Sequence, residues 1–500
     1  MPRGAALSNT ADSLDLDTVR RRVAERLRRV MPADAVVDHP ERLRPFECDA
    51  LSAHRQPPLV VAMPGDADEA AAVLRVCREE GVPVVTRGAG TGLSGGALPL
   101  ANGVLLNMSR MNRILKIDRD NRLARVQPGV RNLQISEAVA DLGLYYAPDP
   151  SSQIACSIGG NVAENAGGVH CLKYGLTVHN VAAVEVLTID GERLTLGSEA
   201  LDAPGFDLLA FVHGSEGLLA VIVEIVVRLL PTPQHAQVLM AAFDDVETAG
   251  DAVAGIIAAG ILPAGLEMMD RGCIDAVNDY LGDVYPRCGA VVLCEADGTG
   301  AEVASELARV RRLLESAGAG EIRVSQSEAE RLRLWSGRKG AFPAVGRLAP
   351  DYYCMDGTIP RRHLGRVLGE IEDLSQRYGL PVVNVFHAGD GNLHPLILFD
   401  ANRDGELDSA EALGGAILTA CVAAGGTVTG EHGVGVEKLD QMCVQFATAE
   451  LSQFHALKAA FDAEGLLNPG KAVPTLARCA EFGAMHVHDG QLPHPELERF

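Results

Sequence analysis

The stretch Thr86-Arg87-Gly88-Ala89-Gly90-Thr91-Gly92-Leu93-Ser94-Gly95-Gly96 is the densest glycine-rich segment of the chain, and it follows the apolar run Val82 to Thr86 directly. Glycine accepts positive φ angles and lets main-chain N–H groups approach phosphate oxygens. After a strand, such a loop predicts a binding site for a phosphate-containing ligand. A single G-x-G pattern is also compatible with an ordinary turn.

A second loop of the same character lies further along the chain. It comprises Pro148 to Ser152 and Ser157 to Gly168, and it is rich in glycine, serine and asparagine. Two such loops in one region favour one extended ligand, such as a dinucleotide. A Rossmann site would place G-x-G-x-x-G at the start of a helix with an acidic residue about 20 residues later, and that arrangement is not convincing here.

The elements around the first loop predict a small βαβ unit. Residues 59–62 form an apolar strand, and residues 66–81 carry helix signals: Asp66 as N-cap, Glu69 at capping-box spacing and Gly81 at the end. A strand over 82–86 follows. Further strands are expected at 104–106, 124–126 and 181–189, and the run 218–230, interrupted by charges and too short to span a membrane, reads as a buried strand.

The chain of 500 residues exceeds what one core usually supports, so two large domains are expected. Pro231 and Pro233 interrupt the strand pattern and mark a boundary. Beyond it, strands at 291–294 and 382–386 alternate with helices such as 302–316, which predicts a second α+β domain. The expected division is an N-terminal helical segment 1–53, a ligand-binding domain 54–232, a second domain 233–474 and a loose tail 475–500.

The composition excludes some functions. A formal net charge of −22 argues against nucleic-acid partners, since that affinity depends on Lys and Arg. The eleven cysteines include no C-x-x-C pair, which speaks against a disulfide framework or an iron–sulfur cluster and for a reducing compartment. The N-terminus lacks the apolar core of a secretory signal, and no membrane span is expected. A cytoplasmic location follows.

The second half carries a cluster of histidines among glycines. The segment 386–394, FHAGDGNLH, holds two histidines on either side of a glycine-rich turn, and 429–435, TGEHGVG, adds a carboxylate and a third imidazole. Two histidines and one carboxylate leave open positions on a divalent metal. Hydrogen-bonded structural histidines are the alternative, because the spacing is not a standard zinc motif.

The glycine loops resemble the FAD-binding domain of the vanillyl-alcohol oxidase and p-cresol methylhydroxylase superfamily, over roughly residues 59–231. The resemblance implies that the first loop holds the pyrophosphate, that the second runs beside the rings, and that the segment 211–223 is a third contact. Thr91 stands where some relatives carry a flavin-linked histidine, so non-covalent FAD is expected. The candidate FAD-binding residues are Arg87, Gly88, Ala89, Gly90, Thr91, Gly92, Ser94, Gly95, Pro150, Ser151, Ser157, Gly160, Asn161, Asn165, Gly167, Gly217, Ile222 and Asn468.

The motifs HAGDGNLH and GEHGVG are similar to the C-terminal signature of FAD-linked D-lactate, glycolate and D-2-hydroxyglutarate dehydrogenases. This resemblance implies that His387, His394 and Glu431 bind a divalent metal such as zinc and that His432 is the catalytic base. Arg338, in Trp335 to Lys339, matches the arginine that holds the substrate carboxylate; a surface basic patch is the alternative.

The fold implied is α+β: a vanillyl-alcohol-oxidase-type FAD-binding domain of two subdomains and an α+β FAD-linked oxidase C-terminal (cap) domain. The motif 468–471, Asn-Pro-Gly-Lys, resembles the point where the chain returns to the flavin domain.

The implied reaction is oxidation of a small 2-hydroxy acid to the 2-oxo acid, with hydride transfer to flavin N5. Where hydroxyglutarate dehydrogenases carry a lysine, this chain has Cys354, which favours glycolate or D-lactate over a dicarboxylate. The implied partners are a quinone or related flavin and iron–sulfur subunits, which would hold the protein at the inner face of the membrane. The alternatives are a non-catalytic flavin-holding subunit, a D-2-hydroxyglutarate dehydrogenase, and a purely structural metal site.

Overall fold

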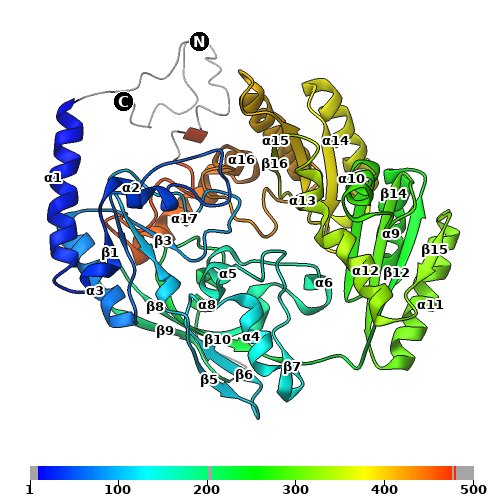
Figure 1. The fold of residues 1–500 in the computed structure, drawn as a ribbon, viewed down its shortest axis with the longest axis horizontal. Helices are drawn as coiled ribbons and strands as arrows, with labels where there is room; N and C mark the ends of the chain where they lie inside the picture. The colour runs from blue at the N-terminus through cyan, green and yellow to red at the C-terminus, as the bar shows by residue number, and fades with distance from the viewer. Residues whose placement is uncertain (1–9, 201–204, 476–477, 480–500) are drawn as a thin grey trace.

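The structure is a computed structural model in which residues 10–200, 205–475 and 478–479 are described. Three larger β-sheets organise these residues: a four-stranded, a five-stranded and a seven-stranded sheet. In Figure 1 the first two lie in one half of the molecule, with α1 (Thr10–Leu27) at its edge, and the seven-stranded sheet fills the other half. The mixed helices and sheets confirm the predicted α+β class.

The four-stranded sheet contains the predicted βαβ unit. Its order is β1-β2-β4-β3, so β4 lies between the two strands that helix α3 connects, and both neighbours pair with it in parallel. Helix α3 begins after Asp66, whose side chain accepts a hydrogen bond from the N–H of Glu69 at 2.9 Å, and ends at Gly81 with φ 62°. The elements are β1 (Val36–Val37), α2 (Pro40–Leu43), β2 (Val60–Ala62), α3 (Ala67–Glu80), β3 (Val84–Arg87) and β4 (Val104–Asn107).

The five-stranded sheet is antiparallel, in the order β5-β6-β10-β8-β9. The apolar run that the sequence suggested as a buried strand is its central strand β10, where only Glu224 and Arg228 are partly exposed. Its strands are β5 (Ile114–Asp118), β6 (Leu123–Val126), β8 (Val181–Leu187), β9 (Arg193–Gly197) and β10 (Val221–Arg228). The connections between these strands hold α4 (Asn132–Val139), β7 (Leu144–Tyr145), α5 (Ile158–Glu164), α6 (Cys171–Tyr174), α7 (Thr177–Asn180) and α8 (Leu208–Val212). Strand β11 (Leu230–Pro231) follows β10 and pairs with β7.

The seven-stranded sheet is covered on both faces, as β12 shows. Leu239, Ala241 and Phe243 pack into one hydrophobic cluster, whereas Val238, Met240 and Ala242 pack into another. This two-residue alternation is the pattern of a strand buried on both sides. The strands, in sheet order, are β15 (Ile322–Val324), β12 (His235–Phe243), β14 (Ala290–Gly298), β13 (Gly265–Asp270), β17 (Val382–Phe386), β18 (Pro395–Phe399) and β16 (Asp351–Cys354).

Two groups of helices cover the two faces of this sheet. Helices α9 (Val246–Ala258), α11 (Gly300–Ser316), α14 (Leu364–Tyr378) and α15 (Glu406–Ala423) pack in the first cluster. Helices α10 (Arg271–Leu281), α12 (Glu328–Lys339) and α13 (Ala341–Val345) pack in the second.

The end of the described chain returns to the first sheet. After α16 (Leu439–Gln445) and α17 (Thr448–Phe461), Leu467 forms a parallel bridge with Val84 of β3, and the N–H of Asn468 donates to the carbonyl of Val84 at 2.8 Å. Figure 1 shows α17 beside the N-terminal strands although their sequence positions are far apart. The strand that leads into the first glycine-rich loop is therefore held by a segment from the end of the described chain.

One covalent link departs from the sequence expectation. Cys443 of α16 and Cys479 form a disulfide, although no disulfide framework was expected. The two cysteines lie 36 residues apart, and only the fold brings their Cα atoms to 5.1 Å, so no local spacing signals the pair. The neighbouring Arg478 also pairs with Asp440, so this part of the expected loose tail is attached; most of the remaining tail lies outside the described residues.

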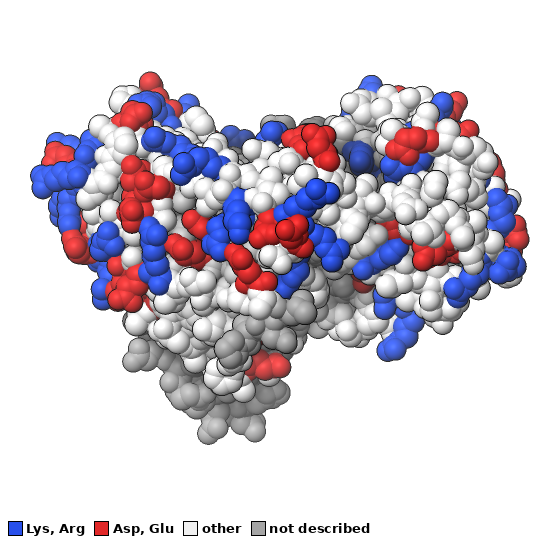
Figure 2. Space-filling view, turned by 90° about the horizontal axis from the view of Figure 1, so that it is seen from below, with Lys and Arg blue, Asp and Glu red and all other residues white. Residues whose placement is uncertain are grey.

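The surface charge and the helices can be compared with the arguments against nucleic-acid binding and a membrane span. On the face shown in Figure 2, Lys and Arg side chains lie among Asp and Glu rather than in one basic patch. Among the described residues, no helix is both long and apolar enough to cross a membrane.

Candidate active site

A cavity of about 500 Å³ lies where the two halves meet. Both glycine-rich loops line it, and so do Phe342, His394, Glu431 and His432 from the second half of the chain. This size falls within the range of about 300–1,000 Å³ that is typical of small-molecule sites. The cavity therefore joins the predicted cofactor loops to the histidine cluster.

Most predicted cofactor residues line this cavity. They are Gly88, Ala89, Gly90, Thr91, Gly92, Pro150, Ser151, Ser157, Gly160, Asn161, Gly217 and Ile222. At Gly88 an added Cβ would lie 2.1 Å from Oγ of Ser157, so glycine lets the two loops approach closely there. The hydroxyls of Ser157 and Thr86 are buried without a partner among the described residues. A closely approaching backbone and hydroxyls without partners suit a ligand with many phosphate oxygens and hydrogen-bond acceptors on its rings, as FAD has.

The other predicted cofactor residues shape the loops instead of lining the cavity. Arg87 donates to the carbonyls of Phe46 and Cys48, and the carbonyl of Ser94 accepts from the N–H groups of Val436 and Glu437. The remaining four also have structural partners. Gly95 packs on Val436, Asn165 caps α5 and accepts from Val178, Gly167 leaves room for Glu431, and Asn468 donates to the carbonyls of Gly96 and Glu216.

The three predicted metal ligands lie together at the cavity. Nε2 of His387 is 3.1 Å and Nε2 of His394 is 3.0 Å from Oε1 of Glu431. Their donor atoms all lie within 4.8 Å of one another. The two imidazole rings are nearly perpendicular, at 84°, which lets in-plane lone pairs converge on one point. Two imidazoles and one carboxylate suit a divalent metal such as zinc and leave coordination positions open.

Glu267, on β13, orients this cluster through hydrogen bonds to side chains next to it. Its Oε1 accepts from Nδ1 of His387 at 2.8 Å, and its Oε2 accepts from Nε of Arg338 at 2.6 Å. The carboxylate is fully buried, and such outer partners fix the tautomer of a ligating histidine. Arg338 is only 2% exposed, so the alternative of a surface basic patch is wrong for this residue. It does not line the cavity, and its Nη2 has no partner among the described residues.

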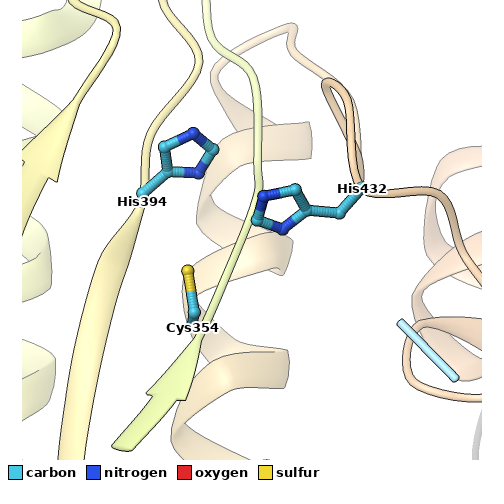
Figure 3. Close-up of side chains that lie close together, drawn as sticks. All are labelled: Cys354, His394 and His432. Carbon is cyan, nitrogen blue, oxygen red and sulfur yellow. The ribbon is translucent and has the colours of Figure 1, made fainter. Parts of the chain in front are cut away.

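His432 lies beside His394, one of the three predicted metal ligands. Figure 3 shows these two histidines together with Cys354. Its ring stacks on that of His394 with centroids 4.9 Å apart, and its Nδ1 has no partner among the described residues. Burial lowers the pKa of His432 to about 4. The imidazole is therefore neutral near pH 7, which is the form that accepts a proton. Cys354, His394 and His432 also gather their donor atoms within 4.8 Å, but stacked rings do not aim their lone pairs at one ion.

Asp356 holds the loop that carries Glu431 and His432. Its carboxylate accepts from the backbone N–H groups of both residues, at 3.2 Å and 2.9 Å, and from Nζ of Lys438 at 3.2 Å. Burial alone would raise the pKa of Asp356, but the charge of Lys438 and the neighbouring imidazoles hold it well below its usual range. An ionised Asp356 thus fixes the backbone on which the site depends.

Two of these organising residues escaped the sequence-based prediction. Glu267 could have been noticed as an acid among the apolar residues of the strand Gly265–Asp270, since a buried charge needs a specific partner. Asp356 follows the quoted Cys354, but nothing in its neighbours signals a contact with residues 75 positions away.

Two segments of the chain match known protein families. Residues 58–197 match an FAD binding domain, and residues 232–472 match the FAD linked oxidases, C-terminal domain. The first match contains both glycine-rich loops, and the second contains the histidine cluster.

Individual relatives span nearly the whole chain. The glycolate oxidase subunit GlcD of Escherichia coli is 62% identical over 485 residues, 97% of each chain. GlcD of Bacillus subtilis is 37% identical over 87% of this chain and 93% of its own length. A D-lactate dehydrogenase of Archaeoglobus fulgidus is 31% identical over 86% of this chain and 96% of its own.

Among solved structures, p-cresol methylhydroxylase superposes with a TM-score of 0.78 at 15% identity, covering 92% of this chain and 98% of its own. This likeness confirms the predicted superfamily fold. The chain belongs to the family of FAD-linked oxidases that includes the glycolate oxidase subunit GlcD, and it is an FAD-dependent oxidoreductase.

Proposed function

We propose that the protein oxidises a short 2-hydroxy monocarboxylate, glycolate or D-lactate, to the 2-oxo acid. The observation that carries the proposal is the group His387, His394, Glu431 and His432 beside the cavity that the flavin loops line. The names of the relatives, a glycolate oxidase subunit and D-lactate dehydrogenases, support the same substrate class.

The cofactor loops have the first task. The backbone of Gly88 to Gly92 and the side chains of Ser157 and Asn161 would hold non-covalent FAD in the cavity. FAD, when bound, supplies the acceptor for the hydride that leaves the substrate. The protein contributes position and electrostatics, because the substrate must sit between the flavin loops and the histidines.

The metal ligands have the second task. His387, His394 and Glu431 would hold a divalent cation, which supplies positive charge next to the hydroxyl and carboxylate of the substrate and favours deprotonation of the hydroxyl. His432 would accept that proton. Its neutral state and its unpartnered Nδ1 both support the role of general base.

Two residues bear on the choice of substrate. We keep Arg338 as the carboxylate anchor, since its guanidinium is tied to Glu267 through Nε while Nη2 lacks a partner among the described residues. Cys354 is buried beside His394, and a short uncharged side chain at this place offers nothing to a second substrate carboxylate. The second point favours glycolate or D-lactate over a dicarboxylate.

The electron acceptor is proposed from the relatives alone. Proteins named as subunits of glycolate oxidase imply partner subunits, and we propose that electrons pass to a partner or to a quinone. The cytoplasmic location, at the inner face of the membrane through such partners, stays a prediction.

The decisive experiment is anaerobic mixing of FAD-replete protein with a stereodefined panel: glycolate, both lactates, both malates and both 2-hydroxyglutarates. We expect bleaching of the flavin by glycolate or D-lactate and little by the dicarboxylates. Bleaching mainly by 2-hydroxyglutarate would overturn the substrate class. No bleaching by any of them would favour a flavin-holding subunit without its own dehydrogenase activity.

A further inference from the structure

Glu164 has a carboxyl group at the cavity that the proposed reaction does not use. It is the last residue of α5 and lines the cavity between the cofactor loops and His432. Its Oε2 is buried without a hydrogen-bond partner, and Glu164 makes no ion pair with any described residue. A buried carboxyl oxygen without a partner is costly unless a ligand or a proton satisfies it.

The position of this carboxyl is defined by three glycines. A Cβ added at Gly433, the residue after His432, would lie 2.1 Å from Oε2, and one added at Gly96 would lie 2.8 Å from Oε1. Gly92 of the first loop is the third neighbour, at 4.0 Å. The group thus lies between the flavin loop and the loop of the proposed base.

Glu216 also borders Gly96 and Gly433, and its carboxylate has hydrogen-bond partners. It accepts hydrogen bonds from the N–H groups of Val434 at 2.6 Å and Gly435 at 2.7 Å, and it is only 6% exposed. Two N–H donors favour the ionised form of Glu216. Two neighbouring buried carboxyls do not both ionise cheaply, so the proton belongs on Glu164.

The nearby lysines do not alter this assignment, because their ammonium groups are engaged elsewhere. Nζ of Lys438 donates to Asp356 and to the carbonyl of Gly433, and Nζ of Lys471 donates to the carbonyls of Gly96 and Leu98. Burial raises the pKa of Glu164 well above its usual range, and the charge of Glu216 adds to that effect. A carboxyl that keeps its proton is a hydrogen-bond donor.

We propose that Glu164 is a neutral carboxylic acid whose O–H donates a hydrogen bond to the flavin in this cavity and thereby favours the reduced flavin. The inference rests on FAD being the cofactor held there. A flavin ring becomes more electron-rich on reduction, and a donor aimed at a group that gains negative charge stabilises the product. Glu164 is then a positioning and tuning residue toward the cofactor.

The test compares two substitutions in the FAD-replete protein without substrate. Glu164→Gln keeps a neutral donor of the same shape, and Glu164→Leu removes the donor. The measurements are the midpoint potential, by equilibration with a reference dye, and the visible flavin spectrum. Glu306→Gln is the matched control, because Glu306 on α11 also has a buried, unpartnered Oε1 but does not line the cavity.

We expect Glu164→Gln and Glu306→Gln to match the wild-type potential and spectrum. Glu164→Leu should shift the flavin equilibrium about tenfold toward the oxidised form, which equals about 30 mV for a two-electron couple. A higher potential in Glu164→Gln would mean that a negative charge had been removed, and it would overturn the neutral form. A wild-type potential in Glu164→Leu would overturn the hydrogen bond.

If the leucine variant does not retain FAD, Glu164→Ala takes its place with the same expected shift and the same overturning result. Wild-type protein that neither retains nor takes up FAD would overturn the cofactor assignment and this inference together. An unchanged potential in FAD-replete Glu164→Leu, or in Glu164→Ala where it takes its place, would overturn this inference alone.

Discussion

Oε1 of Glu267 lies 2.8 Å from Nδ1 of His387, and the carboxylate, which can only accept, fixes the proton on that nitrogen. The opposite nitrogen, Nε2, lies 3.1 Å from Oε1 of Glu431 and is the ring atom left to bind a metal ion. Because Glu267 also binds Arg338, one buried carboxylate orients both a proposed metal ligand and the proposed substrate anchor.

Substitution of Glu267 should therefore weaken metal binding. In Glu267→Gln the amide no longer compels the required tautomer of His387, and loss of an outer-shell partner typically lowers metal affinity about 10- to 100-fold. Competition titration with a zinc chelator measures this. Glu295→Gln, at another buried acid of the same sheet, should leave the affinity unchanged. Equal affinities in the wild type and Glu267→Gln would contradict the orienting role.

The contact between the two cofactor loops gives a rescue experiment. In Gly88→Ala the new methyl group would meet Oγ of Ser157, so the serine hydroxyl or the loops must shift, and FAD affinity should fall about tenfold. Ser157→Ala removes the obstructing oxygen. The double variant should regain the FAD affinity of Ser157→Ala alone, as measured by flavin fluorescence. A double variant as weak as Gly88→Ala would mean that the glycine serves the ligand directly.

The pH dependence of stability should reveal a half-buried histidine that joins the two halves. Nδ1 of His170 lies 2.8 Å from Asp149, and Nε2 lies 3.2 Å from Glu295 of β14. Burial alone would lower the pKa of His170, but the two carboxylates raise it well above its ordinary value. A raised pKa contributes stability that is full below the unfolded pKa of about 6.5 and is lost as pH rises through the folded pKa.

His170→Gln should consequently lower the thermal unfolding midpoint most at pH 6, with the difference from the wild type shrinking at higher pH. Differential scanning fluorimetry from pH 6 to 9 measures it. His39→Gln, at an exposed position, should follow the wild type throughout. A difference that grows with pH would have the wrong sign for a charged His170.

The parts of the fold that the sequence predicted are those with local signals. Helix α3 lies between Asp66 and Gly81 as expected, and the apolar run 382–386 is strand β17. Both predictions succeeded because caps and short apolar runs act within a few residues. The site could be anticipated as far as its motifs reach, since glycines at Gly389, Gly391 and Gly433 let the histidines turn toward one another.

What the sequence could not predict are contacts between distant elements. The pair Arg338–Glu267 joins residues 71 positions apart, and the insertion of β4 between β2 and β3 depends on a pairing that no spacing encodes. The sequence therefore suggested a cofactor role for Arg87, whereas its guanidinium binds the carbonyls of Phe46 and Cys48.

The most direct test of the account concerns His432. We predict that His432→Asn retains FAD and metal but reduces its flavin with glycolate or D-lactate at least about 100-fold more slowly, the usual loss for a missing general base. Anaerobic stopped-flow measurement of flavin bleaching gives this rate, and flavin and metal content are determined on the same sample. Bleaching at the wild-type rate in His432→Asn, with both cofactors present, would contradict the account.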